Sequence, residues 1–157
     1  MRPFAIIGLA AGLLLAVPAQ AQNGAVEAPI KTFIDSFNKG DVAGAMATHV
    51  STGATIVDEI APYMWSGPKS FGDWGASYDK DAKANGITDP AVSVGAPTRE
   101  LVDGDAAYVI VPSVYTFKQK GVPMREKAQM TFALTKTAAG WKIAAWTWTG
   151  PNPNPVK

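Results

Sequence analysis

The chain has 157 residues, no cysteine and a formal net charge of +1, with 47% hydrophobic and 17% charged residues. This length fits one domain with a real hydrophobic core, and the composition excludes a disordered or collagen-like chain. A near-neutral charge provides no electrostatic footprint for nucleic acid or for an anionic membrane surface. Without cysteine there is no disulfide framework, so packing alone must stabilise the fold.

The first 21 residues have the organisation of a secretory signal peptide. A single arginine precedes 14 uncharged residues, Phe4–Val17, and Ala19-Gln20-Ala21 has the small-residue pattern of a cleavage site. The apolar run is shorter than the roughly 20 residues that a membrane-spanning helix needs. We therefore predict a signal peptide at 1–21 and one domain at 22–157, with its ordered core at about 29–150. The mature protein should be periplasmic or secreted, and no longer attached to the membrane.

Three helices are expected in the first half of this domain. Apolar residues in Pro29–Phe37 recur at helical spacing, with Pro29 in the first turn and Asn38-Lys39-Gly40 as the stop. Asp41 is placed to cap a second, short helix that is rich in alanine. Aromatic residues three and four positions apart predict a third helix over Ser70–Asn85.

The remaining segments are strand-like. Ala54–Trp65 indicates a first strand, and Pro62 within it favours an edge or a bend. Four further strands are predicted at Ala91–Leu101, Ala106–Lys118, Pro123–Lys136 and Trp141–Thr149. Their short connections predict an antiparallel meander, and the proline-rich tail after Gly150 is expected to leave the sheet extended. Helices grouped ahead of such a sheet predict an α+β domain with the helices on one face.

Several segments carry a family resemblance: residues 33–41 (FIDSFNKGD), 54–59 (ATIVDE), 65–68 (WSGP) and 140–146 (GWKIAAW). In this order they resemble the nuclear-transport-factor-2-like superfamily and, within it, the SnoaL-like (polyketide-cyclase-like) group. The resemblance implies a cone-shaped fold, in which a curved antiparallel sheet wraps around three helices and encloses a pocket open at one end. Members include enzymes, such as ketosteroid isomerase, and proteins that only bind or assemble, so the fold alone does not give the chemistry.

Asp58 is the first catalytic candidate, because the resemblance places pocket residues in this strand. Burial in an apolar pocket raises the pKa of a carboxyl group, which could then remove a proton next to a carbonyl. Alternation along a strand sends Asp58 and Glu59 to opposite faces, so we expect at most one of them to enter the pocket. The alternative is a structural Asp58 that accepts a hydrogen bond from a helix backbone or a tryptophan N–H.

His49, the only histidine, is the second catalytic candidate, because imidazole is the usual base near neutral pH. A partly buried ring with satisfied nitrogens is the favoured alternative. One histidine cannot supply the pair used by the dehydratases that resemble scytalone dehydratase. An isomerase needs a tyrosine and a carboxylic acid beside its base, and Tyr108, Tyr115 and Glu126 are candidates for these roles.

Aromatic residues give a stronger signal than the titratable ones. They concentrate in the predicted first strand and third helix, where the pocket mouth is expected, and aromatic walls suit a small, flat, apolar ligand. We predict that this ligand contacts Tyr63, Trp65, Trp74, Tyr78 and Tyr115. The alternative is that these rings only fill the core.

Cofactor and metal use are not indicated. One histidine and no cysteine cannot build a zinc site. The aspartate pairs at 79/81 and 103/105 could touch calcium, but solvated helix and turn positions explain them better. No glycine-rich phosphate loop is present.

Apolar residues on both faces of the last strand predict a homodimer. Strict alternation puts Trp141, Ile143 and Ala145 on one face and Trp146 and Trp148 on the other. A sheet that is apolar on both faces is covered on both, here by the helices and by a second subunit. An exposed patch for another partner is the alternative.

Two function classes remain open. One is an exported protein that binds a small hydrophobic molecule without changing it. The other is a cofactor-independent isomerase, cyclase or lyase with Asp58 as general base. The first is favoured because no second catalytic group is visible beside Asp58, and a dimeric scaffold is the third alternative.

Overall fold

Three helices and eight strands make up residues 19–156, the part of the chain that this computed structural model describes. Residues 1–18 of the predicted signal peptide lie outside the described residues. No helix within 19–156 is long and apolar enough to cross a bilayer. The element order confirms the predicted α+β class: three helices and a curved, largely antiparallel sheet.

The first helix is longer than the sequence pattern predicts. Helix α1 spans Ala19–Lys39, so Pro29 lies inside the helix. The prediction that Pro29 occupies the first turn is wrong. The proline removes one backbone N–H donor, and burial of Val26 on one side and Ile30 on the other helps to offset that cost. The helix ends at Lys39. The next residue, Gly40, has a φ of 68°, which glycine adopts at little cost.

The two shorter helices follow their sequence signals closely. Helix α2 (Val42–Ala47) is capped by Asp41, whose Oδ1 accepts a hydrogen bond of 2.9 Å from the Gly44 N–H. Helix α3 (Ser70–Asn85) has the predicted bounds and ends at the left-handed Gly86. The start of α2 and the end of α3 therefore follow from local chemistry, whereas α3 begins after Lys69 without a side-chain cap.

The sheet contains more strands than predicted, in a mixed arrangement. The strands are β1 (Thr55–Val57), β2 (Met64–Trp65), β3 (Ile87–Val94), β4 (Arg99–Asp103), β5 (Ala106–Gln119), β6 (Val122–Thr137), β7 (Gly140–Thr149) and β8 (Asn154–Pro155). The main order is β2-β1-β7-β6-β5-β3, while β4 also pairs with β5 and β8 with β6. Strand β1 runs parallel to β7, with Ile56 opposite Trp146, whereas β5, β6 and β7 form the predicted antiparallel meander.

Three strand predictions need correction. The predicted strand Ala54–Trp65 is a β1–β2 hairpin around Pro62, and Ala91–Leu101 is divided between β3 and β4, which both pair with β5. The tail also returns to the sheet instead of leaving it, as β8 on β6. Its prolines alternate with residues that keep an N–H, and Val156 donates to the Pro123 carbonyl at 2.9 Å.

A β-bulge in β7 changes which side chains face the helices. Ala133 pairs with Ala145 but Leu134 pairs with Ile143, so one extra residue lies in β7 between them. The predicted strict alternation is therefore wrong. Trp141, Ile143, Trp146 and Trp148 all face the helix side, and the first three are buried there.

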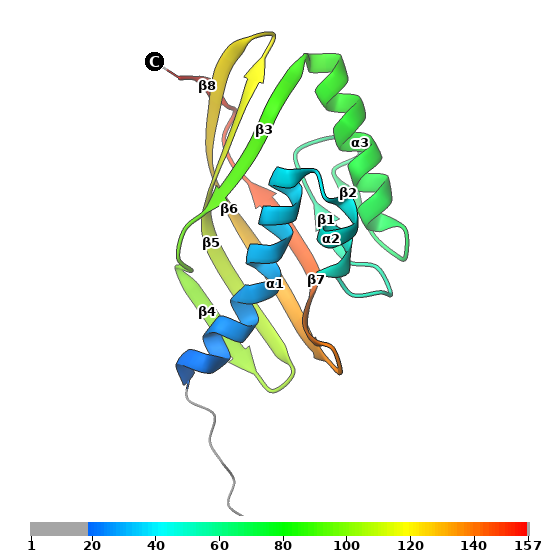
Figure 1. Ribbon diagram of the computed structural model, residues 1–157, viewed down its shortest axis with the longest axis vertical. Helices are drawn as coiled ribbons and strands as arrows, with labels where there is room; N and C mark the ends of the chain where they lie inside the picture. Colours follow the sequence, from blue (N-terminus) through cyan, green and yellow to red (C-terminus); the bar gives the residue numbers. More distant parts are fainter. Residues whose placement is uncertain (1–18, 157) are drawn as a thin grey trace, which may run out of the picture.

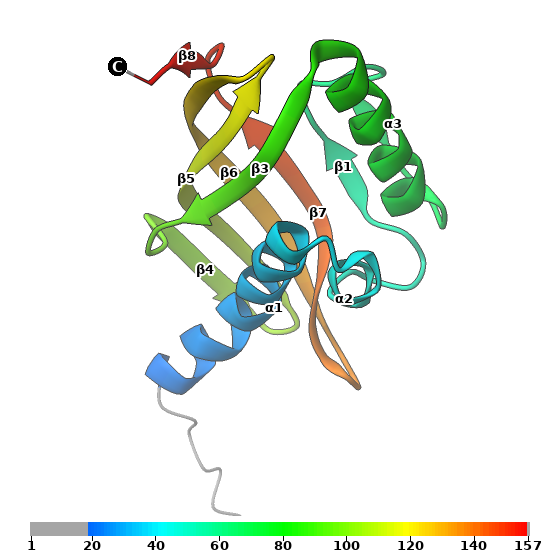
Figure 2. The same cartoon turned by 45° about the horizontal axis from the view of Figure 1, so that its top comes forward.

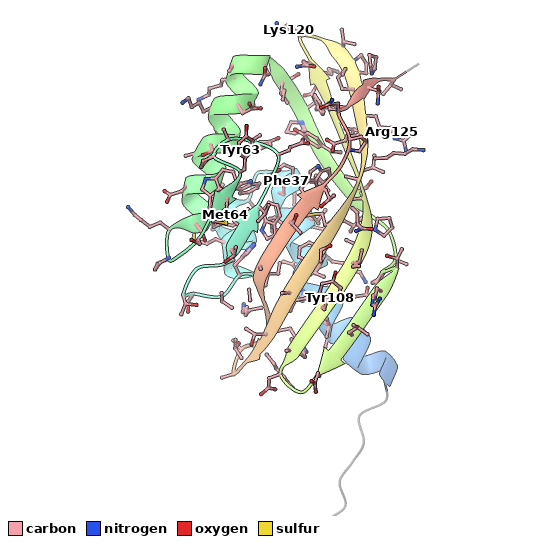
Figure 3. The ribbon with its side chains drawn as sticks, turned by 180° about the vertical axis from the view of Figure 1, so that it is seen from behind. Phe37, Tyr63, Met64, Tyr108, Lys120 and Arg125 are labelled. Carbon is pink, nitrogen blue, oxygen red and sulfur yellow. The ribbon has the colours of Figure 1, made fainter. Side chains whose placement is uncertain are left out.

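All helices lie on one side of the sheet. In Figures 1 and 2, α1 crosses the concave face while α3 stands beside β1 and β3 at its margin. The core between these layers joins Phe33 of α1 to Trp146 and Phe132 of the sheet. Seen from behind, residues 19–156 place no helix on the opposite face of the sheet, and Tyr108 and Arg125 lie on this side (Figure 3).

Candidate functional site

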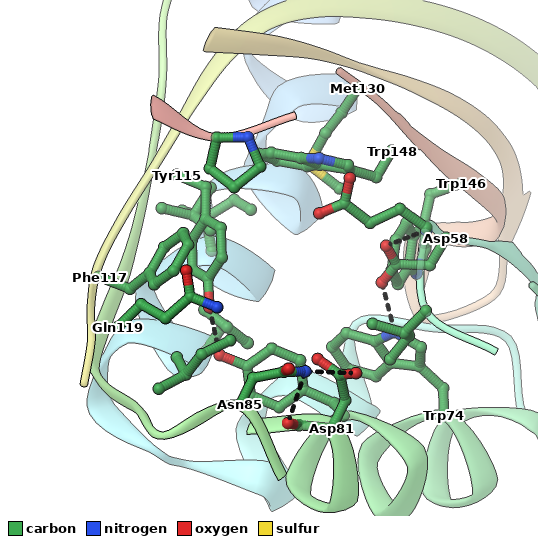
Figure 4. A pocket seen from close by; sticks show the side chains of 18 of the residues that line it. Asp58, Trp74, Asp81, Asn85, Tyr115, Phe117, Gln119, Met130, Trp146 and Trp148 are labelled. Atoms are coloured by element: carbon green, nitrogen blue, oxygen red, sulfur yellow. Dashed lines mark hydrogen bonds between the residues drawn. The ribbon is translucent and has the colours of Figure 1, made fainter. Parts of the chain in front are cut away.

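A cavity of about 360 Å³ lies between the helices and the concave face of the sheet (Figure 4). Its walls come from α1, α3, the turn after β1, strands β3, β5, β6 and β7, and the segment that leads into β8. This volume is in the range of cavities that hold small molecules. The predicted hollow interior, lined by aromatic rings, is therefore present.

Aromatic rings cover two opposite walls of the cavity. The helices contribute Phe33, Phe37, Trp74 and Tyr78, and the sheet contributes Tyr115, Phe117, Trp146 and Trp148. Trp74 meets Trp146 edge to face, with centroids 5.2 Å apart, and Tyr115 stacks on Phe117 at 4.6 Å. Such packed rings make rigid walls, because each ring is held by its neighbours.

A pair of tyrosines connects helix and sheet across the cavity. The Tyr78 and Tyr115 hydroxyls lie 2.8 Å apart and share a hydrogen bond. Burial raises the pKa of both phenols above its ordinary value of 10, so both are neutral at physiological pH. One hydroxyl donates to the other, which leaves the second proton free to donate to a ligand.

Asp58 lies in the cavity wall with both carboxylate oxygens hydrogen-bonded. Oδ2 accepts from the Trp74 indole N–H at 2.7 Å, and Oδ1 accepts from the Glu59 backbone N–H at 2.7 Å. Burial raises the pKa of Asp58, whereas these two hydrogen bonds lower it. The tryptophan N–H is the structural partner that the sequence allowed as an alternative, but it holds the carboxylate at the cavity.

Glu59 also lines the cavity, which corrects the expectation that only one of the two acids would enter it. Strand β1 ends at Val57, so strand alternation does not apply to Asp58 and Glu59, which lie in the following turn. Desolvation raises the pKa of Glu59 to about 8, and the negative charge of Glu126 acts in the same direction. Glu59 therefore keeps its proton at neutral pH.

Glu126 is a buried acid behind the tryptophan wall. Its side chain is 1% exposed, and Oε1 accepts a 2.9 Å hydrogen bond from the Trp148 indole N–H. Burial raises its pKa. Gly150 packs directly on this carboxyl group, since a Cβ at that position would overlap Glu126 Oε1. Trp148 and Gly150 thus fix the orientation of Glu126.

His49 lies apart from this site. It is not in the cavity wall; its Nδ1 lies 3.0 Å from the Ala45 carbonyl oxygen, and its ring packs against Phe33 and Phe71. Burial lowers its pKa to about 4, so the ring is neutral at pH 7. The structure does not bring the two predicted catalytic residues, Asp58 and His49, together.

The predicted ligand-binding residues divide into two groups. Trp74, Tyr78 and Tyr115 line the cavity, whereas Tyr63 and Trp65 do not. Tyr63 is 61% exposed on the β1–β2 hairpin, and Trp65 is buried in the core. The hairpin turns these two residues away from the cavity, so they have no contact with a ligand held there.

Sequence reasoning missed other parts of the wall. Strict alternation placed Trp146 and Trp148 on the face opposite Trp141 and Ile143 without deciding which face lines the cavity, because the bulge in β7 leaves no mark in the sequence. Asp81 and Asn85 of α3 join the wall one and two turns beyond Tyr78, a helical spacing that could have identified them. Among the oxyanion candidates, Tyr115 and Glu126 belong to this region, whereas Tyr108 lies on the opposite face of the sheet.

The carboxyl groups do not form a metal site. Within residues 19–156, no group of three or more acidic or histidine side chains converges closely enough to hold a metal ion. The site is instead a desolvated cavity with aromatic walls, a tyrosine pair and an acidic edge. An α+β domain with a cone-shaped sheet around such a cavity defines a class of small-molecule pocket proteins.

The family comparison agrees with this class. Residues 26–148 match the model of the SnoaL-like domain, and the chain belongs to this family, within the nuclear-transport-factor-2-like superfamily. Members of the family include isomerases, dehydratases and cyclases. A search of curated proteins finds no match to the chain.

Solved structures share the fold at low sequence identity. A ketosteroid isomerase-like protein from Erwinia carotovora atroseptica has a TM-score of 0.64 at 20% identity, with 84% of this chain and 98% of that chain covered. A nuclear transport factor 2-like protein from Salmonella enterica reaches 0.69 at 15%, covering 88% and 96%. The hexachlorocyclohexane dehydrochlorinase LinA-type3 from Novosphingobium barchaimii reaches 0.72 at 13%, covering 88% and 92%. These similarities establish the fold.

Proposed function

We propose that this protein is exported and binds a small, flat, apolar or aromatic molecule in its cavity. The observation that carries the proposal is the hollow itself: about 360 Å³, open at one side and lined by aromatic rings from both layers. A chain that needed these rings only as core would close such a space, because an unfilled cavity costs stability. The signal-like residues 1–21 support export.

Native mass spectrometry of the purified protein tests this proposal. We expect a small molecule to remain bound, or an added aromatic compound to change the emission of Trp74, Trp146 and Trp148. The matched variant is Trp148→Phe, which removes one indole from the cavity wall. It should weaken the ligand-induced change in tryptophan emission while the fold stays intact. An absence of any bound molecule, with unchanged emission across aromatic and steroid-like compounds, would contradict the proposal.

A second candidate is a cofactor-independent isomerase, cyclase or lyase. It is favoured by two carboxyl groups of raised pKa, Asp58 and Glu59, that face the cavity with the Tyr78–Tyr115 pair. Such a carboxylate could remove a proton next to a carbonyl while a tyrosine hydroxyl stabilises the oxyanion. Asp58 was the predicted base, but its two N–H hydrogen bonds make it the weaker base, and Glu59, once it is ionised at a pH near or above its pKa of about 8, is the stronger base.

Deuterium exchange tests the enzymatic candidate. We expect the protein to accelerate the exchange of α-protons of aryl ketones in D₂O, followed by NMR, and Glu59→Gln to lose most of this rate. Asp58→Asn should lose less. Exchange no faster than with an equal concentration of serum albumin would exclude proton abstraction from this ketone class.

The homodimer remains a proposal on a revised basis. The bulge in β7 removes the tryptophans from the outer face, but Leu101 and Tyr108 pair in register there and are 50% and 40% exposed. A second copy could cover this apolar pair. Analytical ultracentrifugation should show a dimer at micromolar concentration and a monomer for Tyr108→Glu. A monomeric wild-type protein would contradict it.

A further inference from the structure

Apart from the two tyrosines, the ionisable side chains in the described wall of the cavity are all carboxylic acids. Asp58 and Glu59 reach it from the turn after β1 and Asp81 from α3, and its described wall contains no lysine, arginine or histidine. Glu126 adds a fourth acid behind the wall, because it lies on the same face of β6 as the cavity residue Met130 and its charge acts on Glu59. An anionic ligand would meet like charges on several sides, which disfavours its binding.

Glu126 and Glu59 form an acidic pair at one side of the cavity. Oε1 of Glu126 accepts from the Trp148 indole N–H. Burial raises the pKa of both acids, and a hydrogen bond between them raises the pKa of Glu59 further while it lowers that of Glu126. The charge of Asp58 raises the pKa of both groups, and no basic side chain among the described residues acts on either of them. The pair therefore adds negative charge that no neighbouring base neutralises.

The aromatic walls supply the second requirement for a cation. A cation attracts the faces of tryptophan and tyrosine rings through their quadrupoles, most strongly when water is excluded. Trp74, Trp148, Tyr78 and Tyr115 bring such rings to the same cavity as the acids. Because the acids do not converge on one point, this arrangement suits a bulky organic cation better than a metal ion.

Resting on the binding function proposed above, we propose that the ligand is an organic cation: an aromatic molecule that carries an ammonium group. Its aromatic body packs between the helix and sheet rings. Its ammonium group lies at the acidic edge formed by Asp58 and Glu59, where the buried Glu126 adds its charge from behind Glu59. The Tyr78–Tyr115 pair on the other side can bind a polar substituent.

The protonation of the acids makes this binding dependent on pH. Glu59 faces Glu126 from β6, Asp58 from its own turn and Asp81 from α3, and its pKa of about 8 reflects burial and these charges. A bound cation favours the ionised form of Glu59, so binding releases protons near neutral pH. Affinity for a fixed cation should therefore rise as the pH rises from 6 to 8.

Calorimetric titration with three matched probes tests the proposal: naphthalen-2-ylmethylammonium, naphthalen-2-ylmethanol and 2-naphthoate at pH 7.5. They share one ring system and differ in charge. We expect the ammonium to bind about tenfold or more tightly than the alcohol, and the naphthoate to bind most weakly. Glu59→Gln and Glu126→Gln should each reduce the ammonium preference while affinity for the alcohol stays within about twofold.

Asp103→Asn is the matched control, because it removes one exposed acid from β4, away from the cavity, and should change none of the three affinities. Equal or tighter binding of the alcohol would overturn the cation preference and leave the binding function intact. If both Glu59→Gln and Glu126→Gln keep the preference for the ammonium probe over the alcohol, the proposal is also overturned. The charge that attracts the cation would then belong to other residues. No binding of any probe would overturn both proposals.

Discussion

His49 and Glu59 are both neutral at pH 7 because the fold desolvates them, yet their surroundings differ. His49 packs against Phe33 and Phe71 and borders a separate hollow outside the aromatic cavity, and the positive charge of Lys142 helps to lower its pKa. Glu59 faces a hollow and three other acids. A shifted pKa therefore does not identify a functional site. The group must also face a cavity that other functional side chains line, as Asp58 and Asp81 do beside Glu59.

The largest expected effect comes from paired isoleucine truncations in the two regions. Ile143 is fully buried and forms a β-bridge with His49, whereas Ile87 is half-buried in the cavity wall. Ile143→Ala should lower the free energy of unfolding by about 2–5 kcal/mol, and Ile87→Ala by about 1 kcal/mol. Urea denaturation measures both. Equal losses of unfolding free energy in the two variants would mean that the core around His49 and the cavity wall are packed equally tightly.

The pH dependence of stability should separate the two groups next. The pKa of His49 falls from 6.5 to about 4 on folding, so its neutral form stabilises the fold above pH 6.5 and this stability is lost as the pH falls through 4. The loss should be about 3 kcal/mol. His49→Phe keeps a ring but cannot titrate, and it should flatten the urea-denaturation profile between pH 6.5 and 4. An unchanged profile would contradict the assignment.

Glu59 should act in the opposite direction. Its pKa rises from 4.5 to about 8 on folding, so its contribution to stability is complete below pH 4.5 and is lost as the pH rises through 8. Glu59→Gln should remove this decline in urea denaturation between pH 5 and 8.5, while Asp103→Asn should keep it. A decline that persists in Glu59→Gln would place the titrating group elsewhere.

The smallest effect concerns the tyrosine pair. Tyr78→Phe removes the hydrogen bond to Tyr115 and should cost about 1 kcal/mol in thermal or urea unfolding. Tyr63→Phe is the matched control, because that side chain is exposed on the hairpin. Equal effects of the two substitutions would show that the pair adds nothing specific.

Local signals carried most of the fold prediction. The Asp41 cap, the Gly86 stop and the spacing in α3 placed two helices, because each depends on neighbouring residues. The parallel pairing of β1 with β7 and the bulge at Ala144 depend on contacts between distant strands, so no local pattern reports them. The family resemblance supplied the hollow that composition alone does not indicate.

The site was predicted in part for the same reason. Trp74, Tyr78 and Tyr115 follow regular helix and strand periodicity, and these residues do line the cavity. Glu59 and Tyr63 lie in an irregular turn and hairpin, where alternation gives the wrong face. His49 was a catalytic candidate mainly because of its residue type. Its position in the fold depends on packing against Phe33 and Phe71, which the sequence does not report.

The indole N–H signals of the five tryptophans test the central claim most directly. Trp74, Trp146 and Trp148 line the cavity, and Trp65 and Trp141 do not. When naphthalen-2-ylmethylammonium is added to ¹⁵N-labelled protein, the first three NMR signals should shift and the last two should stay in place. Shifts confined to Trp65 and Trp141, or no shift at all, would contradict ligand binding in the cavity between the helices and the sheet.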